Sequence, residues 1–533
     1  MAADWLRGLS QKAAHIRMLQ PVYHAALGPL NEELKFSHFP PDLFPADAGR
    51  GRWASMGQID MNGHRLPIDD QWLIGTPWQE SPFFTKLHGF CFLPELQKLG
   101  GDVGRRGVRD ITARWLAYFG RYHPKTWTIR LTAWRLYHWM VIYPFAFETA
   151  PDDFMAMMEE SFYKQHQHLL NDLNKHESLN RHDRFDLIWI LLMVQCHCET
   201  LYDEIACNSY MQLLYGAVED LSLPDEGVRT RDGNGLIDFS QKLIALRHSL
   251  QLADRDAPAW LLKRIETAVR TLNVLTHSDK DLSSFQGTWL PQKAIIEKMT
   301  RLSNSRFRRN DTRYPDYGYS SIRKGRTSVI IDHGKDSDYH VAPLSFEMAY
   351  ANHRLIVNCG TYYGDERWHK SLSQMAAHNC LTVNDKDVKP QKIKSKTSLE
   401  SMNGASLFSG THHGYEADYA LTHTRRIYLD SKGEDLRGED ILARNIAVKT
   451  IPFTVRFHLH PNVKASMTDN RQSVLLRLPS GAGWAFQSNH DTLSLEESIY
   501  CPDGLHLRKS MQITIEGGID DLSHTVKWAL KKL

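Results

Sequence analysis

The chain has 533 residues, more than one ordinary hydrophobic core accommodates, so at least two large domains are expected. Hydrophobic residues at 42% and charged residues at 24% are typical of folded globular proteins and exclude a disordered or fibrous class. The 64 Lys and Arg residues nearly balance the 62 Asp and Glu residues, so the chain lacks the basic excess that draws proteins to nucleic acid. Seven scattered cysteines indicate no disulfide framework.

The N-terminal stretch MAADWLRGLSQKAAHIRMLQPVYHAAL alternates apolar with basic and polar residues, unlike the uninterrupted apolar segment of a signal peptide. We therefore expect a cytoplasmic rather than a periplasmic protein. The longest apolar run, Leu187 to Val194, is far shorter than the roughly 20 residues that cross a bilayer, so no transmembrane segment is expected.

Residues 40–80 are rich in Pro, Gly and Asp, which predicts a small irregular or hairpin segment packed against the helices that follow. From about residue 80 to 280 apolar residues recur at helical spacing, as in TIRLTAWRLYHWMVIYP, where Pro144 ends the run. The run Leu187 to Val194 is apolar on all sides and predicts an inner helix covered by others. These patterns together predict a layered assembly of helices.

After about residue 300 the pattern changes to short alternating segments separated by polar turns. Examples are TSVIIDHG, RLIVNCG, TRRIYLD, TVRFHLHP, SVLLRLPSG, GWAFQS and MQITIEG. Since no helical pattern separates them, they predict an antiparallel sandwich. We therefore expect a helical domain at 1–300 and a β-sandwich domain at 301–533.

One stretch of the β half, residues 338–383, contains the motifs DYHVAPLSFEM, LIVNCGTYY, RWH and AAHNCLTV. In their order they resemble the bacterial heparinase II/III-like family, whose proteins carry runs such as H-x-H-x-D-x-L-S-F-E, L-x-V-D-x-G-T-Y and A-H-N-T. LHGFCFLPELQKLGG and GRYHPKTWTIRLTAWRL extend the resemblance into the helical half. It implies an α+β multidomain chain, with an incomplete (α/α) toroid followed by an antiparallel β-sandwich. It also implies cleavage of acidic, glycosaminoglycan-type polysaccharides by β-elimination.

β-Elimination makes three physical demands on an enzyme. The uronate carboxylate must be neutralised, the weakly acidic proton beside it removed, and the leaving glycosidic oxygen protonated. Asn, Arg and His suit the first task, whereas Tyr and His suit proton transfer.

The resemblance places His340, Asn358 and His378 where relatives hold zinc or face the substrate. His378 and His340 are therefore candidate catalytic residues as well as candidate ligands of a divalent metal. Asn is a poor zinc ligand, so a metal-free, hydrogen-bonded histidine pair is the alternative interpretation. Asn379, in the A-H-N motif, is a candidate substrate contact.

The same stretch departs from the family pattern at two positions. Asp338 stands where relatives have a histidine, and Ala342 replaces an Asp. These changes remove an acid or base that some relatives draw from this strand.

In the helical half, the segment NRHDRFDLIWIL offers Asn180 and His182 as catalytic residues near the carboxylate. The segment EGVRTRDGNGLIDF offers Arg231 and Asn234 as substrate contacts. It lacks the Tyr that the resemblance implies for proton transfer.

The Tyr of the G-T-Y motif and two residues that follow the motif complete the candidate site. Tyr362 is a candidate for proton transfer, although aromatic residues in such strands also serve as core or sugar-stacking surfaces. Arg367 pairs readily with carboxylate or sulfate and Trp368 stacks on sugar rings, which makes both candidate substrate contacts. The alternative is a solvated loop.

Two functions are consistent with these residues. The first is a polysaccharide lyase that cleaves a uronate-containing polymer in the cleft between toroid and sandwich. The second is a non-catalytic glycan-binding or envelope-polysaccharide assembly protein that retains the fold. Asp338, Ala342 and the missing Tyr favour the second function, and an acidic polysaccharide is the expected partner in the first.

Overall fold

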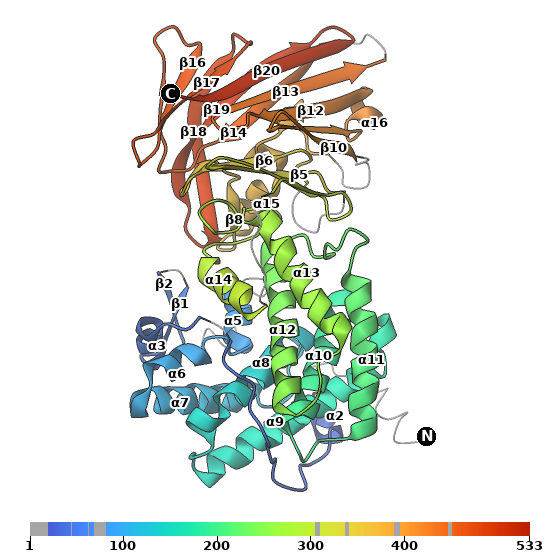
Figure 1. Ribbon diagram of the computed structural model, residues 1–533. Helices are drawn as coiled ribbons and strands as arrows, with labels where there is room; N and C mark the ends of the chain where they lie inside the picture. Colours follow the sequence, from blue (N-terminus) through green and yellow to red (C-terminus); the bar gives the residue numbers. More distant parts are fainter. Residues whose placement is uncertain are drawn as a thin grey trace. The chain divides into compact units, whose positions relative to one another are not determined.

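The polypeptide runs from a helical region into antiparallel sheets (Figure 1), which confirms the predicted fold class. The computed structural model describes residues 20–43, 45–61, 63–68, 82–303, 310–335, 341–388, 395–445 and 450–533. The chain divides into one unit of residues 1–222 and 241–265 and another of residues 223–240 and 266–533. The domain boundary predicted at residue 300 stays a prediction.

Helices form most of the first unit. They are α2 (Gln20–Ala26), α3 (Ala48–Ser55), α5 (Pro82–His88), α6 (Leu93–Leu99), α7 (Gly101–Phe119), α8 (Ile129–Ile142), α9 (Asp152–Leu173), α10 (Arg181–His197) and α11 (Glu204–Leu221). Two further helices, α12 (Gly233–Leu252) and α13 (Ala259–Leu275), are each divided between the two units. Among the helices of the described ranges, none combines the length and the apolar character that crossing a membrane requires.

The local sequence explains where these helices begin and end. Thr128 caps α8 by accepting a hydrogen bond from the Leu131 N–H, and after Ile142 the chain continues as a π-helical turn, η2 (Tyr143–Phe147), that contains Pro144. The predicted inner helix is confirmed, because every residue from Leu187 to Val194 in α10 is fully buried.

The Pro- and Gly-rich segment before these helices contains α3 and a two-stranded antiparallel hairpin. Its strands are β1 (Gln58–Met61) and β2 (His64–Pro67). Helix α3 is in contact with both α6 and α7, so it is packed into the helical unit.

Three sheets make up most of the second unit. The eight-stranded sheet has the order β10-β11-β12-β13-β20-β17-β16-β15, and two five-stranded sheets have the orders β8-β18-β19-β14-β9 and β3-β4-β5-β6-β7. The described pairings are antiparallel except that of β8 with β18. The short helices of this unit are α14 (Lys293–Leu302), α15 (Glu366–Ser373), η4 (Met375–Ala377) and α16 (Glu416–Tyr419).

The strands fall where the sequence alternates. In chain order they are β3 (Thr312–Tyr314), β4 (Tyr319–Lys324), β5 (Thr327–Asp332), β6 (Phe346–Tyr350), β7 (His353–Ile356), β8 (Gly360–Tyr362), β9 (Leu381–Val383), β10 (Ser395–Met402), β11 (Ala405–His412), β12 (Leu421–Leu429), β13 (Asp435–Arg444), β14 (Ile451–His458), β15 (Lys464–Met467), β16 (Ser473–Arg477), β17 (Gly483–Ser488), β18 (Leu493–Gly504), β19 (Arg508–Ile519) and β20 (Ser523–Lys532). In β12 and β13 every second side chain is buried, which places one face of the sheet on a continuous apolar core.

Candidate functional site

Two buried asparagines connect the motif segments of the second unit. Asn358 Oδ1 accepts hydrogen bonds from the Asn379 N–H at 3.1 Å and from Asn379 Nδ2 at 3.2 Å. Asn379 Nδ2 also donates to the Phe346 carbonyl at 2.9 Å, and its Oδ1 accepts from the His458 N–H at 2.6 Å. Both asparagines are fully buried. Asn379 therefore ties the A-H-N segment to β6 and β14.

Glu347 of β6 joins the same network from the other side. One carboxylate oxygen accepts from the Asn358 N–H at 3.0 Å, and the other lies 3.2 Å from His277 Nε2. Arg354 of β7 in turn pairs with Asp279 at 2.7 Å. Because these charged groups are buried and opposite in sign, each offsets part of the cost of removing its partner from water.

His378 lies beside this network with only 2% of its surface exposed. Its Nδ1 is 2.9 Å from the Gln374 carbonyl oxygen, which only accepts, so Nδ1 carries the proton. Burial lowers the pKa of His378, because the charged imidazolium loses its solvation. The ring is therefore held in its neutral form.

His458, at the end of β14, is held in a similar way. Its Nε2 lies 3.0 Å from the Ala376 carbonyl, so its Nδ1 accepts from Ser498 Oγ at 2.8 Å. Burial lowers the pKa of His458 to about 3. Burial also raises the pKa of the neighbouring Cys359 thiol to about 12, so this histidine and thiol are both neutral.

A buried charge cluster supports the network from the eight-stranded sheet. Arg425 donates to the Asn379 carbonyl at 2.7 Å and to Asp440 at 2.7 Å. Asp440 also accepts from His423 at 2.8 Å and from the Trp528 indole at 2.9 Å. Burial alone would raise the pKa of Asp440, but Arg425 and His423 hold it well below its ordinary value.

Helix α15 carries the exposed members of the predicted set. Asp365 caps it by accepting from the Arg367 and Trp368 N–H groups. The Arg367 side chain is 94% exposed and lies 3.9 Å from Asp365, and Trp368 is 38% exposed. Tyr362, in β8, is half-buried and packs against a small cluster that includes Cys359 and Leu372.

The segment that precedes α12 is fixed to the sheet of β3 to β7. Arg231 forms a buried ion pair with Asp332, and its Nε donates to the Tyr317 carbonyl at 3.3 Å. A side chain at Gly334 would collide with the Arg231 guanidinium, which explains the glycine there. Asn234 Oδ1 accepts from the backbone and indole N–H groups of Trp289 at 2.9 Å.

The two candidates of the helical unit lie at the start of α10. Asn180 is the N-cap of this helix, since its Oδ1 accepts from the Asp183 N–H at 2.9 Å. His182 is exposed in the first turn. The catalytic roles predicted for both residues stay predictions.

The predicted zinc set is only partly described. His340, with Asp338 and Tyr339, lies outside the described residues. Asn358 Oδ1 already accepts two N–H groups, so Asn358 fits a hydrogen-bonding role better than a zinc ligand. No group of three or more His, Cys, Asp or Glu side chains within the described ranges is arranged to hold a metal. Zinc stays a prediction, and no step below depends on it.

Sequence reasoning did not select the partners that organise this site. Glu347, His277, Arg425 and Asp440 are separated along the chain, and each belongs to a segment that reads as strand or loop. One signal was present: Arg425 and Asp440 stand at positions of β12 and β13 where alternation predicts inward-facing, buried side chains. A charged residue at such a position indicates a buried partner.

Comparison with known proteins shows which proteins this chain resembles. Residues 307–529 match the family described as Heparinase II/III-like, C-terminal. FtsZ-localized protein C of Caulobacter vibrioides is 26% identical over 531 residues, which cover 92% of this chain and 89% of that protein. The crystal structure of heparinase III superposes with a TM-score of 0.73 at 12% identity, over 99% of this chain and 91% of that chain. A mutant of the heparan sulfate lyase HepC from Pedobacter heparinus gives 0.62 at 14% identity, over 98% and 90%. These matches confirm the predicted resemblance and the lyase-like fold.

Proposed function

Because this chain carries a heparinase II/III-like C-terminal domain within a heparinase III-like fold, we propose that it binds an acidic, uronate-containing polysaccharide without cleaving it. The observation that carries the proposal is that the side chains of His378, Asn379 and Arg231 are engaged in hydrogen bonds or ion pairs within the protein. The name of the Caulobacter relative, which refers to a location and not to a reaction, also supports a non-catalytic role.

A general acid or base must come within roughly 3 Å of the proton that it transfers. His378 is 2% exposed and donates to a backbone carbonyl. Asn379 uses both ends of its amide inside the sandwich. These two residues stabilise the fold and would need a rearrangement to reach a sugar.

Carboxylate binding is limited in the same way. The Arg231 guanidinium is neutralised by Asp332, so it offers no net positive charge to a uronate. By contrast, Arg367 is almost fully exposed and is followed in α15 by Trp368, which is also exposed. An arginine beside an aromatic ring suits a charged sugar, because the guanidinium pairs with the carboxylate and the ring packs on the sugar face.

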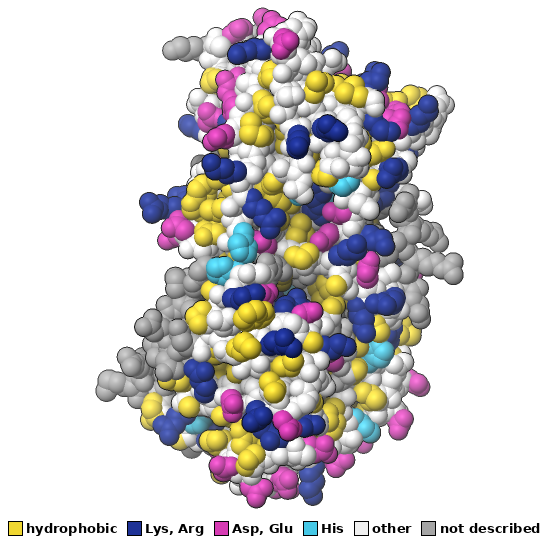
Figure 2. Space-filling model, turned by 90° about the vertical axis from the view of Figure 1, so that its left-hand side faces the viewer, with side chains coloured by type: hydrophobic (Ala, Val, Ile, Leu, Met, Phe, Trp, Pro, Cys, Tyr) yellow, Lys and Arg dark blue, Asp and Glu magenta, His cyan; other side chains and the backbone are white. Residues whose placement is uncertain are grey.

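The surface shown in Figure 2 has Lys and Arg side chains interspersed with Asp and Glu. A ligand therefore gains local pairing more than long-range attraction, and its affinity should fall as salt rises. We expect modest, salt-sensitive binding.

The test measures binding and turnover in one preparation. The protein is titrated with heparan sulfate, hyaluronate and polygalacturonate by calorimetry, and the same mixtures are followed by ultraviolet absorbance for unsaturated uronate. An active heparinase III is the positive control for turnover. We expect heat of binding with at least one polymer and no absorbance rise. No binding to any of the three polymers contradicts the proposal.

The second candidate function is β-elimination itself. The likeness to heparinase III and a heparan sulfate lyase over nearly the whole chain favours it. In that case the absorbance rises in the same assay and His378→Ala, checked for folding by circular dichroism, abolishes the rise.

A further inference from the structure

Two histidines of the second unit lie together, apart from the residues discussed above. His490 follows β17 and His524 is the second residue of β20. Their ring centres are 5.5 Å apart at an interplanar angle of 62°. Both rings also pack on Phe453 of β14, with centroid distances of 5.9 and 5.1 Å. The two histidine rings thus contact the same Phe453 ring.

The hydrogen bonds around His490 determine which of its nitrogens carries the proton. The Thr492 hydroxyl donates its one hydrogen to the Glu516 carbonyl and accepts from the Glu516 N–H at 3.2 Å. It can therefore only accept from His490 Nδ1, which lies at 3.0 Å. Nδ1 therefore carries the proton of the neutral ring, whose lone pair is then on Nε2. Such a hydrogen bond to the second nitrogen is how metal-binding histidines are oriented.

His524 supplies the second nitrogen. Its Nε2 is buried and has no hydrogen-bond partner. His524 stands on the same face of β20 as the buried Val526 and Trp528, because alternate side chains of a strand point the same way. Burial lowers the pKa of His524, which favours the neutral imidazole that a metal binds.

We propose that His490 and His524 together bind a divalent transition-metal ion of the zinc class, each through Nε2. A zinc-bound imidazole has its nitrogen roughly 2.0–2.1 Å from the ion, which puts the ring centre about 3.2 Å away. Two ring centres 5.5 Å apart are therefore within reach of one ion. Since the described part of the chain offers this ion the two histidine nitrogens, water completes the coordination, and the ion is exchangeable. This site is independent of the proposed glycan binding.

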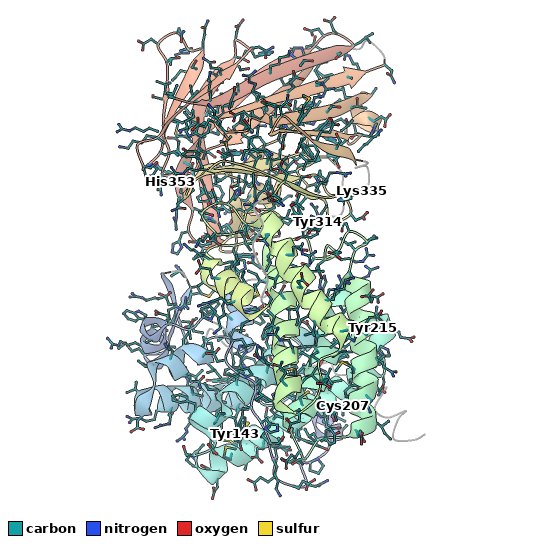
Figure 3. The ribbon with its side chains drawn as sticks, in the orientation of Figure 1. Tyr143, Cys207, Tyr215, Tyr314, Lys335 and His353 are labelled. Atoms are coloured by element: carbon teal, nitrogen blue, oxygen red, sulfur yellow. The ribbon has the colours of Figure 1, made fainter. Side chains whose placement is uncertain are left out.

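Titration with ZnCl₂ by calorimetry tests the site, using the full chain, His490→Gln, His524→Gln and the control His353→Gln. His353 begins β7 and is labelled in Figure 3, well apart in sequence from the pair. We expect one equivalent of zinc to bind the natural protein with micromolar affinity. Each single variant at the pair should bind at least ten times more weakly, and the control should bind as the natural protein does.

Two results would overturn the proposal: zinc affinity no better than millimolar in the natural protein, or unchanged affinity in either variant of the pair. Thermal unfolding without zinc separates loss of the site from loss of folding, and His490, in a turn, is the variant expected to fold normally. Electron paramagnetic resonance of a Cu²⁺-loaded sample provides a direct readout. Hyperfine coupling to two nitrogens is expected in the natural protein and to fewer in the variants, whereas the same spectrum in all four proteins contradicts the site.

Discussion

The Asn358–Asn379 network and helix α15 come from one continuous stretch of sequence, yet they differ in what they can touch. In the network, His378 and the two asparagines are buried and bonded to the protein itself. On α15, Arg367 and Trp368 face solvent. The difference shows that polar residues within an apolar segment look the same in the sequence whether they form hydrogen bonds in the core or bind a ligand. Exposure separates the two cases.

The strongest test of this contrast removes the charge beneath the buried network. Asp440→Leu leaves Arg425 buried and unpaired, which should lower the free energy of unfolding by about 3–5 kcal/mol. The control Asp435→Ala breaks the pair with Arg437, whose side chain is 65% exposed, and should cost less than about 1 kcal/mol. Denaturant unfolding followed by near-ultraviolet circular dichroism gives both values. Equal losses would show that the cluster is not structural.

The next test acts on the network directly. Asn379→Ala leaves the Phe346 carbonyl and the His458 N–H without their partners, at roughly 1–3 kcal/mol each. We expect a total loss of about 2–6 kcal/mol in the same unfolding experiment. Asn462→Ala, at an exposed position, should stay within about 0.5 kcal/mol of the natural protein. A loss confined to ligand binding, with stability unchanged, would reverse our assignment of Asn379.

A third test uses pH. Since the pKa of His458 is depressed to about 3 in the folded protein, the unfolded chain binds the proton more readily below its own pKa of about 6.5. The contribution of His458 is fully present above pH 6.5 and is lost as pH falls, at about 1.4 kcal/mol per pH unit. We expect the unfolding free energy of His458→Gln to depend less steeply on pH between 6.5 and 5 than that of the natural protein. His353→Gln should keep the natural slope, and identical slopes in all three proteins would contradict the assignment.

The smallest stability effect is expected on α15. Arg367→Ala and Trp368→Ala should change the unfolding free energy by no more than about 0.5 kcal/mol, because both side chains are exposed. Polysaccharide affinity should nevertheless fall about fivefold, which corresponds to roughly 1 kcal/mol. Arg437→Ala is the matched control, since Arg437 also pairs with an aspartate two residues earlier. Loss of affinity in the control but not on α15 would place the binding surface elsewhere.

Much of the fold could be predicted from local patterns. The 3.6-residue period gave the right position for α8 and α10, and the short segments expected as strands coincide with β5, β12, β14 and β17. The membership of residues 223–240 in the second unit could not be predicted. It depends on Asp225, which accepts from the Asp316 and Tyr317 N–H groups, and on the ion pair of Arg231 with Asp332. Pairs between residues so far apart along the chain produce no periodic pattern in the sequence.

The candidate site was less predictable than the fold. His378 and Asn379 were selected from their motif, but the sequence did not reveal that Gln374, Ala376 and Phe346 supply backbone carbonyls to this region. Backbone groups have no identity in a sequence, so their use as partners is visible only in three dimensions. For this reason the sequence could not distinguish a reactive site from buried residues that form their hydrogen bonds within the protein.

The position of β20 has a consequence for how the protein is made. This strand, residues 523–532, lies inside the eight-stranded sheet, between β13 and β17. Until β20 has been synthesised and can pair, β13 and β17 present two unpaired edges to solvent or to a chaperone. The sheet therefore closes only after synthesis has passed residue 532, and pauses in translation before that point should expose the chain to aggregation.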